Sequence, residues 1–550
     1  MINKDNPAQP IGLRSLPRKL VITTFGGVLL AMFLGSLDQT VVGTAMPRVI
    51  ADLGGFAHYT WVTTAYLIAS TVTMPIIGKF TDMFGRKWIY ISGIIVFLIG
   101  SLLSGLSQTM TQLILFRGFQ GIGAGIMMAN AFTVIADLFP PAERGKYQGF
   151  TTGTYGLSAV VGPTLGGFIT DRLSWHWVFF VNIPLAVLVI ILFILFFPHF
   201  KSNNLRHKID WAGVTALVLA VVPGMLALSW GGNEYPWLSA PVIGLFALAA
   251  ASLASFIWIE RRASEPIIPL WLFSNRVISI SMLVTFFTGM GMFGGITFIP
   301  LFFQGVLGLS ATTSGSFLTP MMLGQVSGSF LSGQALSRTG GHYRTQGIIG
   351  LLIMAVALFL LSRMTQQTSY SSAVLNIILL GVGLGITMPL YTIAVQNSVP
   401  YNAMGSATST TVFCRTIGAS FGLALFGTIM TNHFAANFLA GVPDLVKSVV
   451  PAGTLNSMAH NPQALVSGDA QTQLQNALAQ LGPQSSSAFA QVIAGMRNAL
   501  DLALARVFLI GLGLVIVAFF INLFLREVPL RKHHVLDQSV PSSSAGPAPR

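Results

Sequence analysis

The chain has 550 residues, of which 53% are hydrophobic and only 8% are charged, and its mean hydropathy is +0.73. An ordinary soluble domain carries about a quarter charged residues, so this composition indicates a polytopic membrane protein. The formal net charge of +13 does not indicate nucleic-acid binding, because nearly every basic residue stands in a short connection between apolar runs. The single cysteine, Cys414, excludes an internal disulfide framework and a cysteine-based metal cluster.

Fourteen runs of about 20 apolar residues predict fourteen membrane-spanning helices. The first six are expected near residues 20–44, 58–79, 88–107, 112–137, 148–170 and 178–198. The other eight are expected near residues 211–229, 240–259, 277–304, 313–336, 346–362, 372–395, 404–430 and 502–525. The first run is too long, and too polar near its end, to be a cleaved signal peptide. The even number places both termini on the same side of the membrane.

The basic residues orient this topology. If the N-terminus is cytoplasmic, the inner segments hold 21 of the 29 Lys and Arg residues and the outer segments hold five, while Arg117, Arg415 and Arg506 fall within spans. Such a bias is what the positive-inside rule describes. The sequence therefore predicts a multi-pass protein of the cytoplasmic (inner or plasma) membrane with both termini in the cytoplasm.

One outer connection is long. It covers about residues 431–501 and is rich in Ala, Gln, Ser and Pro. Leu474, Ala477, Leu478 and Leu481 recur at helical spacing, which indicates two short amphipathic helices broken at Gly482–Pro483. The C-terminal stretch PSSSAGPAPR has the composition of a disordered tail.

A short segment recurs in the two halves of the chain. GKFTDMFGRK begins at Gly78 after the second span, and GQALSRTGGHYR begins at Gly333 after the tenth span, so an offset of 255 residues superposes their glycines. The same offset places Ser337 at the position of Asp82. Two related halves are typical of secondary transporters, which bind their substrate near the midplane between the repeats. Chance similarity between short glycine-rich loops is the alternative.

Several segments resemble known motifs. GKFTDMFGRK (78–87) matches the loop signature G-x3-D-x2-G-R-[KR] of the major facilitator superfamily, and RGFQGIGAG (117–125) is similar to the fourth-span motif of that family. LDQTVVGTAMP (37–47), GLSAVVGPTLGG (156–167) and WHWVFFVNIP (175–184) resemble motifs of its 14-span drug:proton antiporter branch. The resemblance extends over the membrane part but not over the long outer connection, and Ser337 departs from the acid of the loop signature.

The resemblance implies an all-α membrane protein with the major facilitator fold: two six-helix bundles, an inserted two-helix hairpin and 14 transmembrane helices. The implied segments are a cytoplasmic N-terminal segment (1–19), an N-terminal bundle (20–198), linkers with the hairpin (199–276), a C-terminal bundle including the outer loop 431–501 (277–526) and a cytoplasmic tail (527–550). It also implies proton-driven export of lipophilic, often cationic, compounds without a cofactor.

Asp38 is the one acid deep within a predicted span. An acid there is costly, and desolvation favours its neutral form, so it can take up a proton on one side and lose it on the other. The alternative is a static polar contact. Arg117 stays charged and, by the resemblance, biases the carboxylate towards ionisation; its alternative role is snorkelling to the interface. We expect proton coupling at Asp38 and Arg117.

Two motifs predict moving or closely packed helices. We expect Gly78, Asp82, Gly85, Arg86 and Lys87 to form a cytoplasmic gate, because Asp82 can accept hydrogen bonds from Arg86 or from a neighbouring helix N-terminus. A turn with membrane-anchoring basic residues is the plainer interpretation. Small residues of the antiporter motif permit close packing of the fifth span. They are Gly156, Gly162, Pro163, Gly166 and Gly167.

Aromatic, thioether and amide side chains of the second half indicate an adaptable substrate pocket. The candidates are Phe286, Met290, Phe293, Gln304, Gln325, Met388, Tyr391 and Gln396. Most such residues also fit an ordinary core. Asp and Glu are absent from Pro266 to Pro443, which indicates neutral, monocationic or lipid-like substrates rather than dications.

The sequence carries no enzyme signature, such as a P-loop or a zinc motif. The favoured function is a proton-coupled antiporter that exports lipophilic or monocationic drugs by alternating access. One alternative is an exporter of lipids or lipoconjugates, with loop 431–501 as a lid or as the docking site for a periplasmic or cell-envelope partner. A second alternative is a proton-coupled uptake symporter. The expected partners are the substrate and the lipid bilayer, not nucleic acid.

Overall fold

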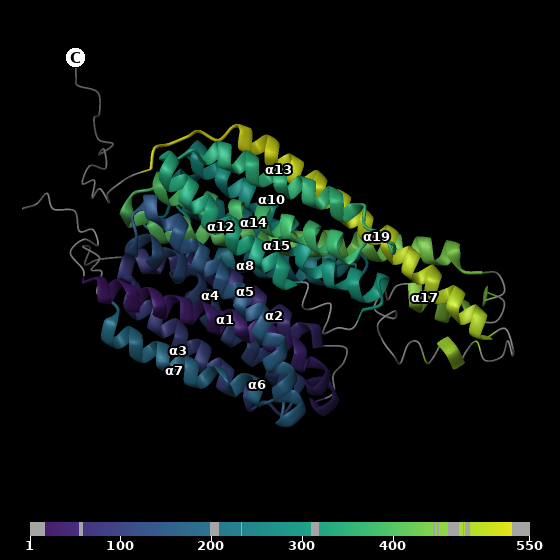
Figure 1. Cartoon of the computed structure of the whole chain (residues 1–550). Coiled ribbons are helices and arrows are strands. Elements are labelled where there is room, and N and C mark those ends of the chain that lie inside the picture. Colours follow the sequence, from purple (N-terminus) through teal and green to yellow (C-terminus); the bar gives the residue numbers. More distant parts are fainter. Residues whose placement is uncertain are drawn as a thin grey trace, which may run out of the picture.

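A computed structural model describes residues 17–53, 59–198, 208–232, 234–309, 318–443 and 485–530, together with parts of 446–478. Within these residues the chain is helical and forms no β-sheet. The helices gather into two lobes, one from each half of the sequence (Figure 1). The predicted tail at 541–550, the first 16 residues and the expected break at Gly482–Pro483 lie outside the described residues.

The first lobe consists of six long helical segments. They are α1 (Arg18–Leu53), α2 (Tyr59–Phe84), α3 (Arg86–Gly105), α4 (Met110–Leu138), α5 (Pro141–Arg172) and the pair α6 (Trp177–Phe180) and α7 (Asn182–Phe196). Helix α4 is the centre of this lobe, since α2 and α3 pack along it and α1 contacts it as well. Helix α1 also packs on α5 and α7. The two ends of the lobe's core are formed by separate apolar clusters.

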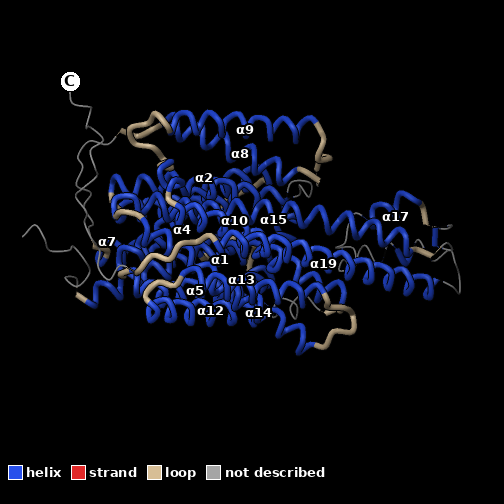
Figure 2. The backbone as a smooth tube through the Cα atoms, turned by 90° about the horizontal axis from the view of Figure 1, so that it is seen from above, coloured by secondary structure: helices blue, strands red, loops and turns tan. Residues whose placement is uncertain are grey.

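A hairpin follows, formed by α8 (Trp211–Trp230) and α9 (Ala240–Glu260), and then a short 3-10 helix, η3 (Leu270–Ser274). The hairpin lies on the flank of the molecule (Figure 2), where α8 contacts α2 of the first lobe and α15 of the second. The second lobe contains α10 (Arg276–Leu301), the π-turn η4 (Phe302–Val306), α12 (Leu318–Thr339), α13 (Tyr343–Ser362), α14 (Tyr370–Ser398), η5 (Tyr401–Ala403), α15 (Met404–Gly441), α17 (Ala452–Ala459) and α19 (Ser485–Leu523).

Twelve helices of the described chain are long and apolar enough to cross a membrane. Helices α5 and α12 are also long, with 32 and 22 residues, but they are more polar. These two helices pack against each other across the junction of the lobes. Because part of their surface faces protein rather than lipid, they need fewer apolar residues, which accounts for their lower hydropathy.

The recurring glycines have the same backbone conformation. Gly85 separates α2 from α3 with φ of 88°, and Gly340 follows α12 with φ of 74°, as the offset of 255 residues predicts. A positive φ is readily adopted by glycine alone, so the turn geometry recurs although Asp82 and Ser337 differ. We call the end of the molecule that holds this turn the Gly85 end; the starts of α5 and α15 and the end of α12 also lie there.

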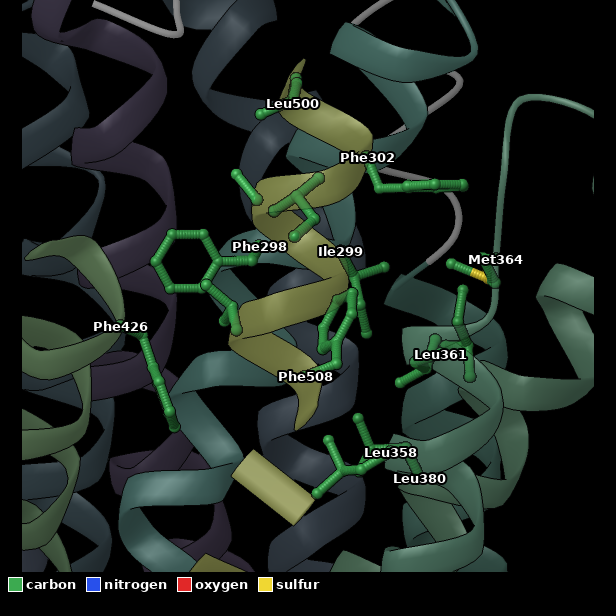
Figure 3. Packing of buried hydrophobic residues seen from close by; sticks show 14 of the residues in the cluster. Phe298, Ile299, Phe302, Leu358, Leu361, Met364, Leu380, Phe426, Leu500 and Phe508 are labelled. Atoms are coloured by element: carbon green, nitrogen blue, oxygen red, sulfur yellow. The ribbon is translucent and has the colours of Figure 1, made fainter. Parts of the chain in front are cut away.

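The second lobe has a continuous apolar core, in which Phe298, Ile299, Phe302 and Phe508 interlock (Figure 3). This core continues outward along α15 and α19, where Phe434, Phe438, Val492 and Met496 are buried at a spacing of four residues. The sequence predicted that one span ends near residue 430 and the next begins near residue 502. The structure differs, because the buried apolar residues continue along both helices beyond these limits. Helix α15 continues to Gly441 and α19 begins at Ser485, so both helices extend beyond the other helices of the lobe (Figure 1).

Candidate functional site

Asp38 is completely buried in the middle of α1, and three side chains from two other helices donate hydrogen bonds to its carboxylate. Arg117 Nη1 lies 2.6 Å from Oδ2, while Gln120 Nε2 and Asn182 Nδ2 lie 2.9 and 2.8 Å from Oδ1. Arg117 and Gln120 belong to α4 and Asn182 begins α7. All three donors point at the carboxylate, and one of them is the guanidinium of a buried arginine.

Arg117 also contacts an amide oxygen and an aromatic ring. Its Nη1 also donates to Gln120 Oε1 at 2.8 Å, and its guanidinium carbon lies 4.2 Å from the centre of the Tyr66 ring. Asn182 donates in addition to Ser101 Oγ at 3.0 Å. Adding a proton to the carboxylate would leave the buried arginine without its counter-charge, which is strongly unfavourable.

Sequence reasoning found Asp38 and Arg117 but missed Gln120, Asn182 and Ser101. All three are completely buried. A signal was present: Gln120 follows Arg117 by three residues, which places both on one face of α4, and Asn182 is a lone amide in an apolar run. Nothing in the sequence, however, predicts that α7 carries its amide to the same point as α1.

The second cluster lies at the Gly85 end. Both oxygens of Asp82 accept hydrogen bonds from the first turn of α15: Gly405 N lies 2.8 Å from Oδ1, and Ser406 N lies 2.7 Å from Oδ2. Arg86 Nη1 donates to Asp82 Oδ1 at 2.8 Å, and Arg86 Nε donates to Asp137 Oδ2 at 3.0 Å. An acid from the first lobe therefore caps a helix of the second lobe, where the helix dipole favours a negative charge.

The neighbouring gate residues complete this contact between the lobes. A methyl group on Gly78 would overlap Ser409 Oγ and would lie 2.7 Å from the carbonyl oxygen of Gly405. The glycine thus allows the backbones of α2 and α15 to touch. Lys87 does not take part in this contact between the lobes. Its Nζ donates to the carbonyl oxygen of Ile194 near the end of α7, within the first lobe.

A third set of contacts joins the lobes beside the gate. Arg144 is buried at the start of α5, where Nη2 donates to Ala136 O at 2.7 Å and Nη1 to Gln396 Oε1 at 3.3 Å. Gln396 Nε2 in turn donates to Phe132 O at 3.4 Å and Thr408 Oγ1 at 3.2 Å. Gln396 was expected in a substrate pocket, but the structure places it in the contact between α4, α5, α14 and α15.

The antiporter-motif residues pack α5 on two different partners. A methyl group on Gly162 would overlap Thr40 Oγ1, and one on Gly166 would overlap Thr44 Oγ1, so the motif is in close contact with α1. Gly156 instead faces α12, where an added Cβ would lie 3.1 Å from Met322 Cβ. Pro163 is exposed, and a Cβ on Gly167 would meet nothing within 4 Å.

The proposed pocket residues do not form one group. Phe286 packs edge-to-face on Phe287 and Phe421, while Gln325 Nε2 donates to Met388 Sδ at 3.0 Å. The other candidates have their own surroundings. Met290 is buried where α10 meets Gly422 of α15, Gln304 lies in the π-turn η4, and the Phe293 side chain lies outside the described residues.

Tyr391 is buried in the interior of the second lobe rather than facing the first lobe. Its hydroxyl donates to Asn522 Oδ1 of α19 at 2.9 Å, and Asn522 Nδ2 donates to the carbonyl oxygen of Arg344 at 3.1 Å. This chain of hydrogen bonds ties α14 to α13 and α19. The hydroxyl of Tyr391 is therefore satisfied within the second lobe.

The sequence model of the family described as Major Facilitator Superfamily matches residues 28–210 and 211–423, which together are more than half of the chain. The chain belongs to the major facilitator superfamily. It is therefore a multi-pass membrane transporter and not an enzyme.

Curated relatives support the same conclusion for this superfamily member. The multidrug transporter protein MdtP of Bacillus subtilis is 40% identical over 534 residues, covering 96% of each chain. The multidrug resistance protein 3 of Bacillus subtilis is 39% identical over 452 residues, covering 82% of this chain and 87% of the relative. The solved structure of the proton:xylose symporter XylE has the same fold, with a TM-score of 0.55 at 15% identity, covering 94% of this chain and 98% of that one.

Proposed function

We propose that this transporter is a proton-coupled antiporter that exports lipophilic compounds across the cytoplasmic membrane by alternating access. The ion pair of Asp38 and Arg117 carries the proposal. It is completely enclosed, it has one titratable member, and its protonation leaves a buried charge unbalanced. The names of the two Bacillus relatives support drug export as the direction and purpose of transport.

The proposed orientation places the Gly85 end in the cytoplasm, in accord with the distribution of basic residues. It also counts α5 and α12 as spans, giving fourteen with the hairpin inserted between two bundles. The lobes are joined at the Gly85 end by Asp82, Arg144 and the glycine contacts. The conformation is then closed towards the cytoplasm, and a proton can reach Asp38 from outside.

The coupling step follows from the hydrogen bonds. In the closed conformation the carboxylate of Asp38 accepts from Arg117, Gln120 and Asn182. A protonated carboxyl group keeps only part of this acceptor capacity and no longer balances the arginine. Helices α1, α4 and α7 therefore shift relative to one another, and opening of the Gly85 end releases the proton to the cytoplasm as the site is hydrated.

The experiment is substrate-driven proton movement in proteoliposomes, comparing wild type with Asp38→Asn. An ethidium-like dye and a neutral lipophile are offered separately under an imposed pH gradient. We expect wild type to exchange protons for at least one compound and Asp38→Asn to bind it without exchange. Asp171→Asn, at an exposed acid of α5, is the matched control and should behave as wild type. Undiminished coupling in Asp38→Asn would show that this acid is only a structural contact.

The direction of exchange separates antiport from the symport alternative. With the outside made acidic, an antiporter moves the compound outward while protons enter, whereas a symporter carries both inward. Counting compound and protons in the same vesicles decides between the two. Movement in a common direction would replace the antiport proposal with uptake.

A further inference from the structure

Arg415 of α15 lies where the two lobes meet. Its guanidinium carbon is 5.5 Å from the centre of the Phe132 ring, which belongs to α4 of the other lobe. The backbone behind it is covered by α10, since a Cβ on Gly289 would overlap the Arg415 carbonyl oxygen. The side chain is half-buried and is thus held inside the molecule while part of its surface stays open.

The other arginines buried between helices have strong acceptors. Arg86 contacts two carboxylates, Arg117 contacts one, and Arg144 donates to backbone carbonyls and an amide. Arg415 differs from all three. Within the part of the chain that the structure describes, its side chain makes no ion pair and no hydrogen bond.

The sequence provides no nearby acid for Arg415. The stretch from Pro266 to Pro443, which contains α10, α12, α13, α14 and α15, holds no Asp or Glu. In the first lobe the interior acids Asp38, Asp82 and Asp137 are each bound to another arginine. A guanidinium has five N–H donors and stays charged, so an inward-facing arginine without an acceptor is costly unless something else binds there.

The face of α4 that Arg415 contacts carries aromatic and sulfur-containing side chains. Phe132 and Met128 are four residues apart on α4 and share one face of it. The hydroxyl of Tyr155 on α5 donates to Met128 Sδ at 2.9 Å, which places the tyrosine on the same face of α4 as Phe132. The site therefore combines apolar side chains, which suit the lipophilic part of a ligand, with one guanidinium, which suits a polar group at its end.

We propose that Arg415 binds the negatively charged end, such as a carboxylate, of a lipophilic substrate at the junction of the lobes. This inference rests on the proposed export function and narrows its substrate class. An uncompensated guanidinium attracts an anion and repels a cation, so lipophilic anions replace the monocationic compounds expected from the sequence. Phe132 and Tyr155 hold the apolar body beside it.

The charge of such a substrate fits the energetics of antiport. Moving an anion out while a proton moves in transfers charge in one electrical direction. A membrane potential that is negative inside therefore drives both movements. Export of a cation in exchange for one proton moves no net charge and gains nothing from the potential.

The test uses three pyrene probes with the same apolar body and different ends: pyrenebutyrate, pyrenebutanol and pyrenebutylammonium. Their binding to the purified full-length protein is measured by fluorescence titration. Charge-assisted hydrogen bonds contribute about 1.5–3 kcal/mol, so wild type should bind the butyrate at least about ten-fold more tightly than the ammonium probe. Arg415→Gln should lose this preference, and Arg415→Lys, which keeps the charge but not the fork, should retain part of it.

Arg363→Gln is the matched control, because Arg363 also lies over a phenylalanine ring, that of Phe359, but is exposed at the end of α13. It should leave all three affinities unchanged. Equal or tighter binding of the ammonium probe by wild type would overturn the inference. It would equally be overturned if Arg415→Gln kept the preference for butyrate and lost only proton exchange, since Arg415 would then act in coupling.

Proton exchange with the same probes in proteoliposomes separates this inference from the function beneath it. Exchange driven by pyrenebutyrate in wild type and lost in Arg415→Gln supports both. Exchange driven by the ammonium probe alone leaves the proposed antiport intact and rejects the anion site. Absence of exchange with every probe and with the ethidium-like dye rejects the proposed function itself, whatever the probe affinities are.

Discussion

Gly145 of α5 and Gly333 of α12 face each other so closely that a methyl group on either would overlap the backbone of the other. A similar contact joins Gly78 of α2 to Gly405 of α15, where a Cβ on Gly405 would lie 2.5 Å from the Gly78 carbonyl oxygen. Gly78 and Gly333 are the two positions superposed by the offset of 255 residues. The lobes are thus joined at the Gly85 end by two related glycine crossings.

Adding one methyl group at this crossing should prevent full closure of the Gly85 end. Overpacking costs typically about 1–3 kcal/mol, enough to shift a two-state equilibrium roughly ten-fold. We expect Gly333→Ala to lower proton-coupled export by about that factor and to raise solvent access to the Gly85 end, measured by hydrogen exchange. Gly167→Ala is the control, because its Cβ would meet nothing within 4 Å. Equal activity of the two variants would contradict the need for close contact.

Removing one member of the buried pair should be more damaging than removing both. Breaking a buried ion pair costs about 3–5 kcal/mol because a charge is left unbalanced, whereas an apolar replacement of the pair is often near neutral. We expect Arg117→Met to lower the unfolding temperature strongly and Asp38→Leu/Arg117→Met to restore much of the loss. Thermal unfolding of the detergent-solubilised single and double variants gives the coupling energy. Additive losses would show that the two side chains stabilise the fold independently.

Asp82 should control the contact between the lobes through its charge. Asp82→Asn keeps the shape but removes the negative charge that faces Arg86 and the N-terminus of α15. We expect export to fall at least about ten-fold, since charge-assisted hydrogen bonds are worth about 1.5–3 kcal/mol. Asp171→Asn, at an exposed acid, should change export less than two-fold, because surface substitutions usually change the free energy by no more than about 0.5 kcal/mol. Normal export by Asp82→Asn would show that the charge of Asp82 is not needed for the contact between the lobes.

Tyr391→Phe should affect stability and leave substrate preference unchanged. The variant loses the hydrogen bond to Asn522, which contributes about 1 kcal/mol. We therefore expect a small fall in the unfolding temperature and an unaltered order of affinities for a panel of dyes. Tyr370→Phe, at an exposed position, is the comparison for stability. A changed order of dye affinities would instead show that Tyr391 contacts the substrate, as the sequence predicted.

Features that depend on local sequence were predictable. Apolar runs predicted the helices, the offset of 255 residues predicted equivalent connections after α2 and α12, and a lone acid in an apolar run pointed to Asp38. The sequence also allowed two partners for Asp82, Arg86 and a helix N-terminus, and both contacts are present. These inferences need only hydrophobic periodicity, the internal repeat, the cost of burying an acid and the hydrogen-bonding capacity of a carboxylate.

Features that depend on how distant helices meet were not predictable. Gln396 and Tyr391 look like pocket residues in the sequence, yet the first joins Arg144 between the lobes and the second joins Asn522 within one. Periodicity shows which side of a helix is polar but not which helix faces it. For the same reason Asn182, a ligand of the Asp38 carboxylate, was not identified.

The flanking hairpin has a consequence for how lipophilic compounds arrive. Helix α8 covers the seam between α2 and α15, with Leu217 and Val221 packed among their apolar side chains, and Lys79 Nζ lies 2.5 Å from Glu265 Oε2 beyond α9. At the opposite end Trp237 Nε1 donates to Thr428 Oγ1 at 3.1 Å. A compound dissolved in the bilayer meets this plug on one side of the molecule. Neither hairpin helix packs on the opposite seam of α5 and α12, so the two seams between the lobes are covered unequally and the molecule is asymmetric within the plane of the membrane.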